Sequence, residues 1–344
     1  MGRSCNNIGF PSAFLHAGSE SFSLYLDLFG NNDDRYDCDN DLELSISFDS
    51  VMKSIKLHSY AKVNLTLEVS AKREDGYHDI DSVVQIIDIN DELNISRADT
   101  GVIEVITDTA GVPSGRYNLV YRAFEAFIDA VGIRGGVKCD LRKNIPPQAG
   151  LGGGSGDAAA AIVGLNQLYE CGLSAERLAE IGAKIGSDVP LFIYGGTVRM
   201  RGRGELVEPL PDAPELHLVV LKPDVGVSTA WAYLELDKSA ARTISVTSDN
   251  MEGAVHAHDR DTLIRSLSND FDPVVSDAVI EVREAKKALI ECGAEAAMLA
   301  GSGSAVFGIF GSKYNAESAA VKLSESFKEV FVTRTLRRSE SSLS

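Results

Sequence analysis

The chain has 344 residues, 44% hydrophobic and 24% charged, a composition that is ordinary for a soluble globular protein of about two domains. Its net charge of −17 argues against binding to nucleic acid or to an anionic membrane, although a cleft of opposite local charge can still bind a small anion. The five cysteines include no CxxC pair, so we expect unpaired thiols. No stretch reaches the roughly 18 apolar residues that span a bilayer, and the N-terminus lacks a secretory signal, so we expect a cytoplasmic protein.

Residues 1–51 form an acidic extension that contains two basic and nine acidic residues. The run NNDDRYDCDND holds too few apolar side chains to offset the entropy of ordering, so we expect a disordered and dispensable extension. A partner-binding tail is the alternative. Met52 is a candidate start of the functional chain.

The regular pattern begins with the segment SYAKVNLTLEVS, residues 59–70. Its apolar residues alternate with polar ones, which predicts a half-buried strand and places Lys62 and Asn64 together on the face away from the core. The segment EDGYHD at 74–79 is typical of a turn. Apolar runs predict further strands at 83–89 and 102–107.

The next elements mix helices with strands. We expect a helix over 118–131, capped by Asn118 and ended by Gly132, and a strand over 136–142. Because the elements do not alternate strictly, the pattern favours an α+β fold, with domains at 52–215 and 216–340. The remaining predictions are helices from 155, from 174, at 256–268, 277–291 and 315–327, and strands at 196–201, 216–222, 296–300, 304–310 and 329–336.

A glycine-rich loop precedes the helix expected from Ser155. Four glycines within five residues let the backbone approach a ligand closely, and the following helix directs unpaired N–H groups and a positive dipole at it. This combination predicts a phosphate site. The loop matches neither GxxxxGK[ST] nor GxGxxG, and a flexible linker is the simpler alternative. The glycines are Gly150, Gly152, Gly153 and Gly154.

A second glycine run, AGSGSAVFG at 300–308, lies between two predicted strands. A tight hairpin explains such a run equally well. If it faces the first loop, it forms the other wall around the phosphates.

Lys62 and Asp188 are the candidates for acid–base chemistry. Asp188 precedes a proline and apolar residues, where it could serve only as a helix N-cap, and Lys62 on its strand could be only a solvated side chain. Phosphoryl transfer needs mainly positioning, together with a carboxylate that accepts the proton of the attacking hydroxyl and a cation beside it. The two residues supply those roles if the fold brings them together.

From about residue 59 to 336 the chain resembles the GHMP small-molecule kinases. The resemblance rests on AKVNLTL (61–67), REDGYHDI (73–80), AGLGGGSGDAA (149–159), SDVPLF (187–192), GVSTAWAY (226–233) and AGSGSAVFG (300–308). It implies a two-domain fold, with an N-terminal ribosomal-protein-S5-like domain that carries the ATP loop and a C-terminal ferredoxin-like α/β domain. The DGYH turn is specific to the branch that uses ATP and Mg²⁺ to phosphorylate the 2-hydroxyl of a substrate with a cytidine diphosphate group.

The resemblance also implies roles for individual residues. Lys62 and Asp188 match the catalytic pair, with Asp188 as the base, and no residue is implied as a metal ligand. Substrate contacts are implied for Asn64, for Tyr77 by stacking on cytosine, for His78 by hydrogen bonding to it, for Tyr233 on the other face of the base, and for Gly301, Ser302 and Gly303 near the phosphates. ATP contacts are implied for Asn118, Lys143, Pro147, Gly150, Leu151, Gly152, Gly153, Gly154, Ser155 and Asp157.

The sequence departs from the family pattern at Gly156, where many relatives have a second serine, and at Gln148-Ala149. Two other functions remain open at this stage. One is a kinase of the same fold for mevalonate, homoserine or a sugar, which would not need the DGYH turn. The other is a non-catalytic nucleotide sensor, which would not need Asp188. The sequence does not indicate the oligomeric state.

Overall fold

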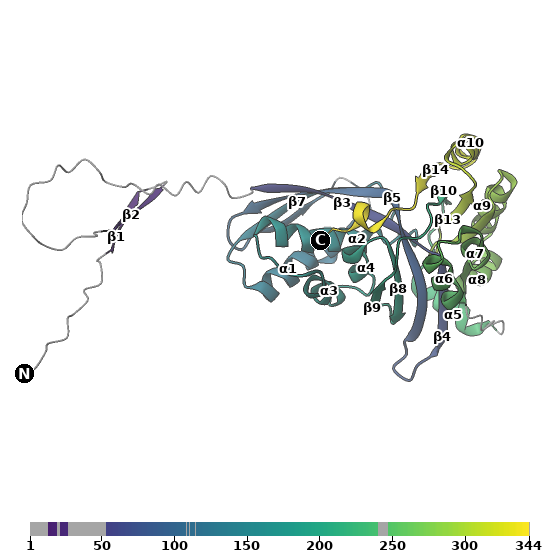
Figure 1. Cartoon of the computed structure of the whole chain (residues 1–344), viewed down its shortest axis with the longest axis horizontal. Helices are drawn as coiled ribbons and strands as arrows, with labels where there is room; N and C mark the ends of the chain where they lie inside the picture. Colours follow the sequence, from purple (N-terminus) through teal and green to yellow (C-terminus); the bar gives the residue numbers. More distant parts are fainter. Residues whose placement is uncertain are drawn as a thin grey trace, which may run out of the picture. The chain divides into compact units, whose positions relative to one another are not determined.

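The computed structural model describes residues 13–18, 21–26, 53–107, 109, 111–113, 115–239 and 247–343 (Figure 1). The chain divides into two units, Met1–Met52 and Lys53–Ser344, which we call the extension and the body. In the extension, strands β1 (Ala13–Gly18) and β2 (Ser21–Leu26) pair antiparallel, where the sequence predicted no ordered element. The acidic run lies outside the described residues, so its expected disorder stays a prediction.

Strand β5 (His78–Ala98) organises the larger of the two sheets of the body. Along its 21 residues it pairs antiparallel with β4, β8, β3 and β7. The short strands β6, β9 and β11 extend the edges of this sheet. The bounds are β3 (Ser54–Asn64), β4 (Thr66–Lys72), β6 (Ile103–Ile106), β7 (Gly136–Arg142), β8 (Thr197–Gly202), β9 (Leu206–Pro209) and β11 (Ser268–Asn269).

Four helices lie on one face of this sheet and enclose a core of aliphatic and aromatic side chains; three of them contact the strands, and the fourth packs on the other helices (Figure 1). The first is capped as expected, because Asn118 Oδ1 accepts a hydrogen bond from Val120 N at 2.8 Å, and it ends at Gly132 with φ of 77°. The helices are α1 (Leu119–Val131), α2 (Gly153–Leu168), α3 (Ala175–Ala183) and α4 (Val189–Tyr194), and a 3₁₀ turn, η2 (Gly115–Tyr117), precedes α1.

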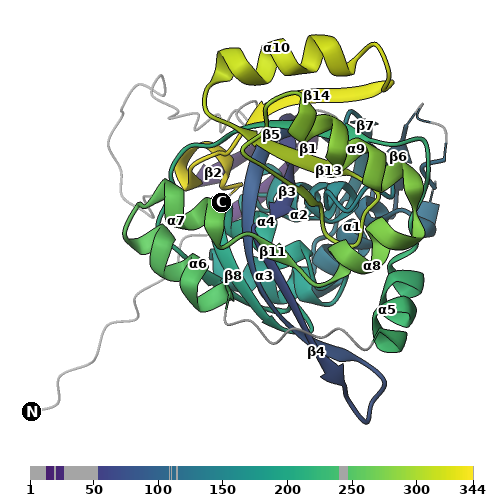
Figure 2. The same cartoon turned by 90° about the vertical axis from the view of Figure 1, so that its right-hand side faces the viewer.

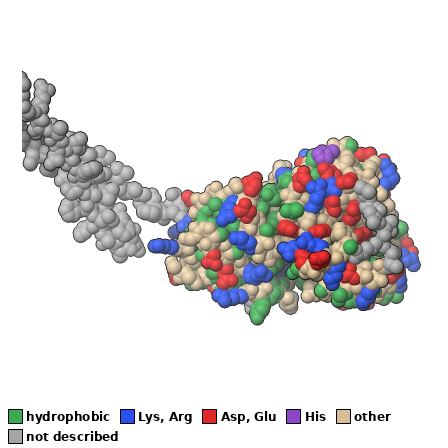
Figure 3. Space-filling model, turned by 90° about the horizontal axis from the view of Figure 1, so that it is seen from below, with side chains coloured by type: hydrophobic (Ala, Val, Ile, Leu, Met, Phe, Trp, Pro, Cys, Tyr) green, Lys and Arg blue, Asp and Glu red, His purple; other side chains and the backbone are tan. Residues whose placement is uncertain are grey.

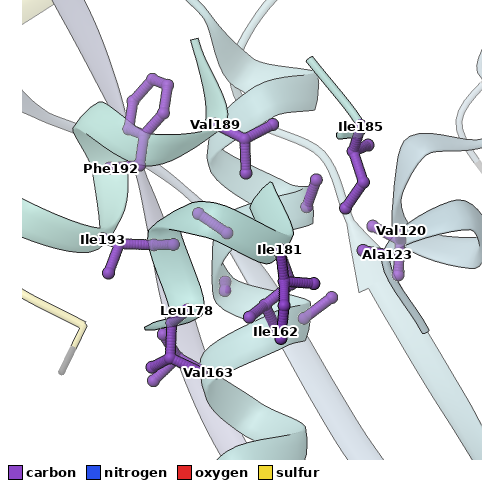
Figure 4. Close-up of a cluster of buried hydrophobic side chains, with 14 of the residues drawn as sticks. Val120, Ala123, Ile162, Val163, Leu178, Ile181, Ile185, Val189, Phe192 and Ile193 are labelled. Atoms are coloured by element: carbon purple, nitrogen blue, oxygen red, sulfur yellow. The ribbon is translucent and has the colours of Figure 1, made fainter. Parts of the chain in front are cut away.

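Helix α4 is short but firmly packed against α2 and α3. Figure 4 shows Val189, Phe192 and Ile193 in one cluster with Ile162 of α2 and Ile181 of α3, and all five side chains are buried. Burial of large apolar side chains from a short helix fixes its axis. The packing of α4 therefore fixes the backbone position of Asp188, the residue at its N-terminus.

A second, four-stranded antiparallel sheet has the order β12-β13-β10-β14. Helices α9 and α10 pack on it, with α10 lying along β14 in Figure 2. Helices α6 and α7 pack on each other, and α6 contacts β4 and β5 of the larger sheet. The bounds are β10 (His217–Lys222), α5 (Thr229–Lys238), α6 (Thr247–His256), α7 (Arg260–Arg265), α8 (Phe271–Ala278), α9 (Ile280–Glu291), β12 (Ala296–Leu299), β13 (Val306–Phe310), α10 (Lys313–Leu323) and β14 (Glu329–Arg334).

The last residues return to the larger sheet. Gln85 Nε2 donates to the carbonyl of Leu336 at 2.8 Å, and Ser341 of helix α11 (Arg338–Ser341) accepts from the backbone N–H of Gly196 at 2.8 Å. The domain boundary expected at 215 falls between β9 and β10, where the chain passes from one sheet to the other. The two-unit division of the chain does not test a boundary inside the body, so this boundary stays a prediction.

The α+β class is confirmed, and most predicted elements lie within a few residues of the observed ones. The strand predicted at 59–70 is wrong in detail, because it begins at Ser54 and is interrupted at Leu65, where the chain passes from β3 to β4. The helix predicted at 256–268 is wrong in its bounds, because only α7 (Arg260–Arg265) lies within it and α6 ends at His256. Helices α4, α5, α6, α8 and α11 and strands β9 and β11 were not predicted.

The structure also bears on the cysteines and on membrane spans within the described residues. Cys139, Cys171 and Cys292 are all free thiols. Across the described ranges, every helix is too short or too polar to cross a lipid bilayer.

Candidate active site

One cavity of about 970 Å³ collects most of the candidate residues. It lies between the glycine loops, the start of α4, the β4–β5 hairpin and α5. Segments that are far apart in the sequence therefore share one site. The predicted residues that line it are Lys62, Asn64, Tyr77, His78, Gly150, Gly152, Asp188, Tyr233, Gly301 and Ser302.

Lys62 and Asn64 lie on the same face of β3, as the alternation predicted. Lys62 Nζ donates to Asn64 Oδ1 at 2.7 Å, and Asn64 Nδ2 donates to Ser82 Oγ at 2.8 Å. The simpler alternative, in which Lys62 is only a solvated side chain, is not supported, because Lys62 is only 5% exposed. The glycine loop covers it, and the Lys62 backbone N–H donates to the carbonyl of Leu151 at 2.9 Å.

Burial lowers the pKa of Lys62, and the negative charge of Asp188 opposes that change. Asp188 also contributes, after burial, to raising the pKa of Tyr233 to about 12. The carboxylate at 188 is thus near enough to both groups for its charge to act on them. Lys62 and Asp188, 126 positions apart in the sequence, converge on one cavity.

Asp188 stands at the N-cap position of α4, but its side chain makes no capping hydrogen bond. The simple alternative, in which Asp188 only caps a helix, is therefore not supported. Its backbone is fixed by the packing of α4, while its half-buried carboxylate lines the cavity. This leaves the carboxylate available to a ligand.

The first glycine loop is shaped by close approach of backbones. Gly150 has φ of +77°, and a Cβ there would lie 1.9 Å from the carbonyl oxygen of Ala300. Gly152 has φ of +74°, and a Cβ there would lie 3.1 Å from Lys62 Cγ. Only glycine fits both positions. The 16-residue helix α2 begins at Gly153, so its free N–H groups are directed at the loop, as a phosphate site requires.

The second glycine run forms both the expected hairpin and the expected second wall. Strands β12 and β13 pair on either side of it, and Ala305 N donates to the carbonyl of Ala149 in the first loop at 3.1 Å. Asn269 anchors the second glycine run, since its side-chain Nδ2 donates hydrogen bonds to the carbonyls of Leu299 and Gly301 at 3.0 and 2.8 Å. No sequence pattern indicated this role for Asn269.

Lys143 and Asp157 lie behind the start of α2, outside the cavity lining. Lys143 Nζ donates to Asp157 Oδ2 at 2.6 Å and also to Asp91, which is fully buried. Burial acts to lower the pKa of Lys143, but the two carboxylates outweigh it and the pKa is raised. Burial raises the pKa of Asp157, the attraction of Lys143 opposes this, and the charge of Asp91 adds to the rise, so that the pKa is about 7.

Asn118 uses its side chain for the cap of α1 and for a bond from Nδ2 to the carbonyl of Pro113 at 2.9 Å. It is nevertheless near the loop, because a Cβ at Gly154 would lie 3.4 Å from Cδ1 of the adjacent Leu119. Asn118, Lys143 and Asp157 thus lie near the N-terminal end of α2. The ATP contacts that the resemblance implies for these three residues stay predictions. The remaining implied ATP residues, Pro147, Leu151, Gly153, Gly154 and Ser155, belong to the same loop and helix start but do not line the cavity.

Aromatic residues gather at the other end of the cavity. Tyr77 is 56% exposed, while the Tyr233 ring stacks on His78 with centroids 5.0 Å apart. His78 Nδ1 donates to the carbonyl of Ser70 at 2.9 Å, and its Nε2 lies 3.4 Å from Asp237 Oδ2. A base that hydrogen-bonds to this imidazole must share Nε2 with Asp237. The proposed cytosine contacts of these residues stay predictions.

Gly156, the departure from the family pattern, has a packing explanation. A Cβ at this position would lie 2.6 Å from Ser59 Oγ and 2.9 Å from the carbonyl oxygen of Tyr60. The glycine lets α2 lie close to β3. Among the residues that the structure describes, no group of three or more His, Cys, Asp or Glu side chains is arranged to hold a metal ion.

Sequence reasoning missed several residues that line the cavity. They have no distinctive local pattern, because each lies in a turn, in a helix or at the end of a strand that only the tertiary fold brings to the site. They are Lys72, Lys184, Arg203, Thr229, Asp237 and Phe271.

Comparisons with known proteins agree with this geometry. Residues 118–196 match the GHMP kinases N terminal domain, and residues 251–329 match the GHMP kinases C terminal domain. The chain is 42% identical over 275 residues to the 4-diphosphocytidyl-2-C-methyl-D-erythritol kinase of Pelotomaculum thermopropionicum, covering 80% of this chain and 96% of the relative. It is also 42% identical to the enzyme of that name from Moorella thermoacetica, covering 83% of this chain and all of the relative.

Solved structures show the same fold. A crystal structure of 4-(cytidine 5'-diphospho)-2C-methyl-D-erythritol kinase superimposes with a TM-score of 0.69 and 29% identity, covering 82% of this chain and 99% of that one. Homoserine kinase from Cytophaga hutchinsonii also gives 0.69 but is only 21% identical, over 85% and 98% of the two chains, and this shows the fold alone. The chain therefore belongs to the GHMP kinase family, among the 4-diphosphocytidyl-2-C-methyl-D-erythritol kinases.

Proposed function

We propose that this protein transfers a phosphoryl group from ATP to the 2-hydroxyl of 4-(cytidine 5'-diphospho)-2-C-methyl-D-erythritol, a step of non-mevalonate isoprenoid precursor biosynthesis. Family membership supports the activity, because the relatives that the chain covers almost completely carry this name. The observation that carries the proposal is that one cavity is lined by Lys62, Asp188 and both glycine loops at one end and by aromatic side chains at the other.

The geometry of the cavity supports a catalytic role for two residues. The Asp188 carboxylate accepts the proton of the substrate hydroxyl, which activates the oxygen for attack. Lys62, held by Asn64, directs its side-chain nitrogen into the same cavity, and the charge of Asp188 opposes the lowering of the Lys62 pKa by burial. The two side chains need no chemistry beyond proton transfer and charge stabilisation, since positioning dominates phosphoryl transfer.

The glycine loops suit the phosphates of a nucleotide. ATP, when bound, supplies the phosphoryl group that is transferred. The N–H groups at the start of α2 and the backbone of Gly150–Ser155 would face the phosphates on one side, and Gly301 and Ser302, which line the cavity, would face them on the other. Gly303 follows them in the second glycine run but does not line the cavity, so its phosphate contact stays a prediction. Mg²⁺ would be held mainly by those phosphates, as is usual where the protein offers few carboxylates.

The substrate end takes the cytidyl group. Tyr77 and Tyr233 offer ring faces for stacking, and His78 offers a polar edge, the combination that recognises a pyrimidine. Kinases of the same fold that act on mevalonate or homoserine have no base to recognise.

A panel assay tests the proposal. Purified protein is supplied with ATP, Mg²⁺ and one alcohol at a time: the cytidyl substrate, mevalonate or homoserine. We expect ADP to accumulate only with the cytidyl substrate. Accumulation with mevalonate or homoserine alone would assign a different kinase activity, and no ADP with any alcohol would support a nucleotide sensor.

A further inference from the structure

The charge of the cavity is opposite in sign to that of the protein. The chain carries −17, and acidic side chains are interspersed with basic ones on the face of the body in Figure 3. The cavity is lined by four cationic side chains and only two acidic ones. A pocket of this sign suits an anionic ligand. The cations are Lys62, Lys72, Lys184 and Arg203, and the carboxylates are Asp188 and Asp237.

Arg203 differs from the other three cations in its contact. Its guanidinium carbon lies 4.9 Å from the centroid of the Tyr77 ring, within the range of a cation–π interaction. Within the described ranges of the chain, Arg203 makes no ion pair with a carboxylate. The guanidinium therefore keeps its full charge and all its N–H donors for a ligand.

The turn that carries Arg203 is built to hold this position. It joins β8 to β9, and Gly202 and Gly204 on either side of Arg203 have φ of +70° and +107°. Glu205 accepts a hydrogen bond from the Arg203 backbone N–H at 2.7 Å, so its carboxylate anchors the turn. A Cβ at Gly204 would lie 3.3 Å from Ser187 Cβ, which places the turn against the residue before Asp188.

We infer that Arg203 binds the diphosphate of the substrate, and that it occupies the ring face of Tyr77 until cytosine arrives. This inference rests on the proposed function. The cytosine stacks on the Tyr77 face that the guanidinium covers in the structure. The displaced guanidinium then pairs with the diphosphate, which one ribose separates from the base.

Both new contacts, cytosine with the Tyr77 ring and Arg203 with the diphosphate, are stronger than the contact between Arg203 and Tyr77 that they replace. Stacking of a base on an aromatic ring is a stronger interaction than an exposed cation–π contact. A guanidinium forms paired, charge-assisted hydrogen bonds to phosphate oxygens, which are stronger than its contact with a ring. Arg203 thereby links recognition of the base to recognition of the diphosphate, and so distinguishes cytidine diphosphates from cytidine itself.

The test compares the wild type with Arg203→Gln, Arg203→Lys and the control Arg201→Gln. Arg201 lies two residues away, carries the same charge, pairs with Glu208 and does not line the cavity. The KM values for the cytidyl substrate and ATP are measured, together with competitive inhibition by cytidine 5'-diphosphate and by cytidine. Melting temperatures confirm that each variant is folded.

We expect Arg203→Gln to raise the KM for the cytidyl substrate and the Ki of cytidine 5'-diphosphate about tenfold, as loss of a charge-assisted contact does. The Ki of cytidine and the KM for ATP should not change. Arg203→Lys should fall between the wild type and the glutamine variant, and Arg201→Gln should match the wild type.

Two results would overturn the inference alone, namely an unchanged Ki of cytidine 5'-diphosphate in Arg203→Gln, or an equal rise in the Ki of cytidine. Absence of turnover of the cytidyl substrate by the wild type would instead refute the proposed function, and the inference with it.

Discussion

Replacing Asp157 with asparagine tests the buried charge cluster beneath the glycine loop. The cluster consists of Lys143 between Asp91 and Asp157, all three with side chains at most 6% exposed. Asparagine has the shape of the protonated carboxyl and leaves the ion pair of Lys143 with Asp91 in place. The variant therefore removes one titration with little change in packing.

The magnitude follows from the pKa of Asp157, which is raised from 3.8 to about 7. A group whose pKa is higher in the folded state contributes stability that is complete below pH 3.8 and is lost as the pH rises through 7. Between the two pKa values each pH unit removes about 1.4 kcal/mol. From pH 5 to pH 8 the wild type therefore loses about 2–3 kcal/mol that the Asp157→Asn variant keeps.

The assay is urea denaturation of the two proteins at pH 5, 6, 7 and 8. The difference in free energy of unfolding between them cancels the titrations that both share. The free energy of unfolding of Asp157→Asn should increase relative to that of the wild type as the pH rises. The exposed Asp140→Asn on β7 is the matched control and should show no such trend. A difference that stays constant over this range would refute the account of the cluster.

Three further predictions concern other parts of the molecule. His78→Ala should raise the KM for the cytidyl substrate and leave the KM for ATP unchanged in steady-state kinetics; an unchanged substrate KM would remove His78 from base recognition. Gly150→Ala, whose Cβ would meet the Ala300 carbonyl, should lower kcat/KM for ATP by about 10²-fold, while Gly172→Ala, also at positive φ but in open space, should not. Deletion of 1–51 should leave kcat and melting temperature almost unchanged, because the body is one compact unit; an insoluble product would contradict this.

The sequence predicted the local features of the fold well. The cap at Asn118, the glycine stop at Gly132 and strand β7 depend on nearby residues, and the structure confirms them. Strand β5 was predicted only in part, as 83–89. Its charged positions interrupt the apolar pattern, yet four neighbouring strands pair with it. Pairing of that kind is decided by tertiary structure.

In the candidate site, too, the sequence predicted features that depend on nearby residues and not those that depend on tertiary structure. The glycine loops were recognisable because glycine has a local meaning, and the convergence of Lys62 with Asp188 was expected only through family resemblance. The partners that hold the site were not predicted. Asp91 beneath Lys143, Asn269 beneath the second loop and Arg203 over Tyr77 each act across a large sequence separation. No spacing rule connects such residues.

The most direct test of the central claim is the turnover of Asp188→Asn with ATP and the cytidyl substrate. Asparagine keeps the size of the side chain but cannot accept the hydroxyl proton. We predict that kcat falls by about 10²-fold or more, while the affinity for ATP and the melting temperature match the wild type. Turnover close to that of the wild type would contradict the role of Asp188 as the base.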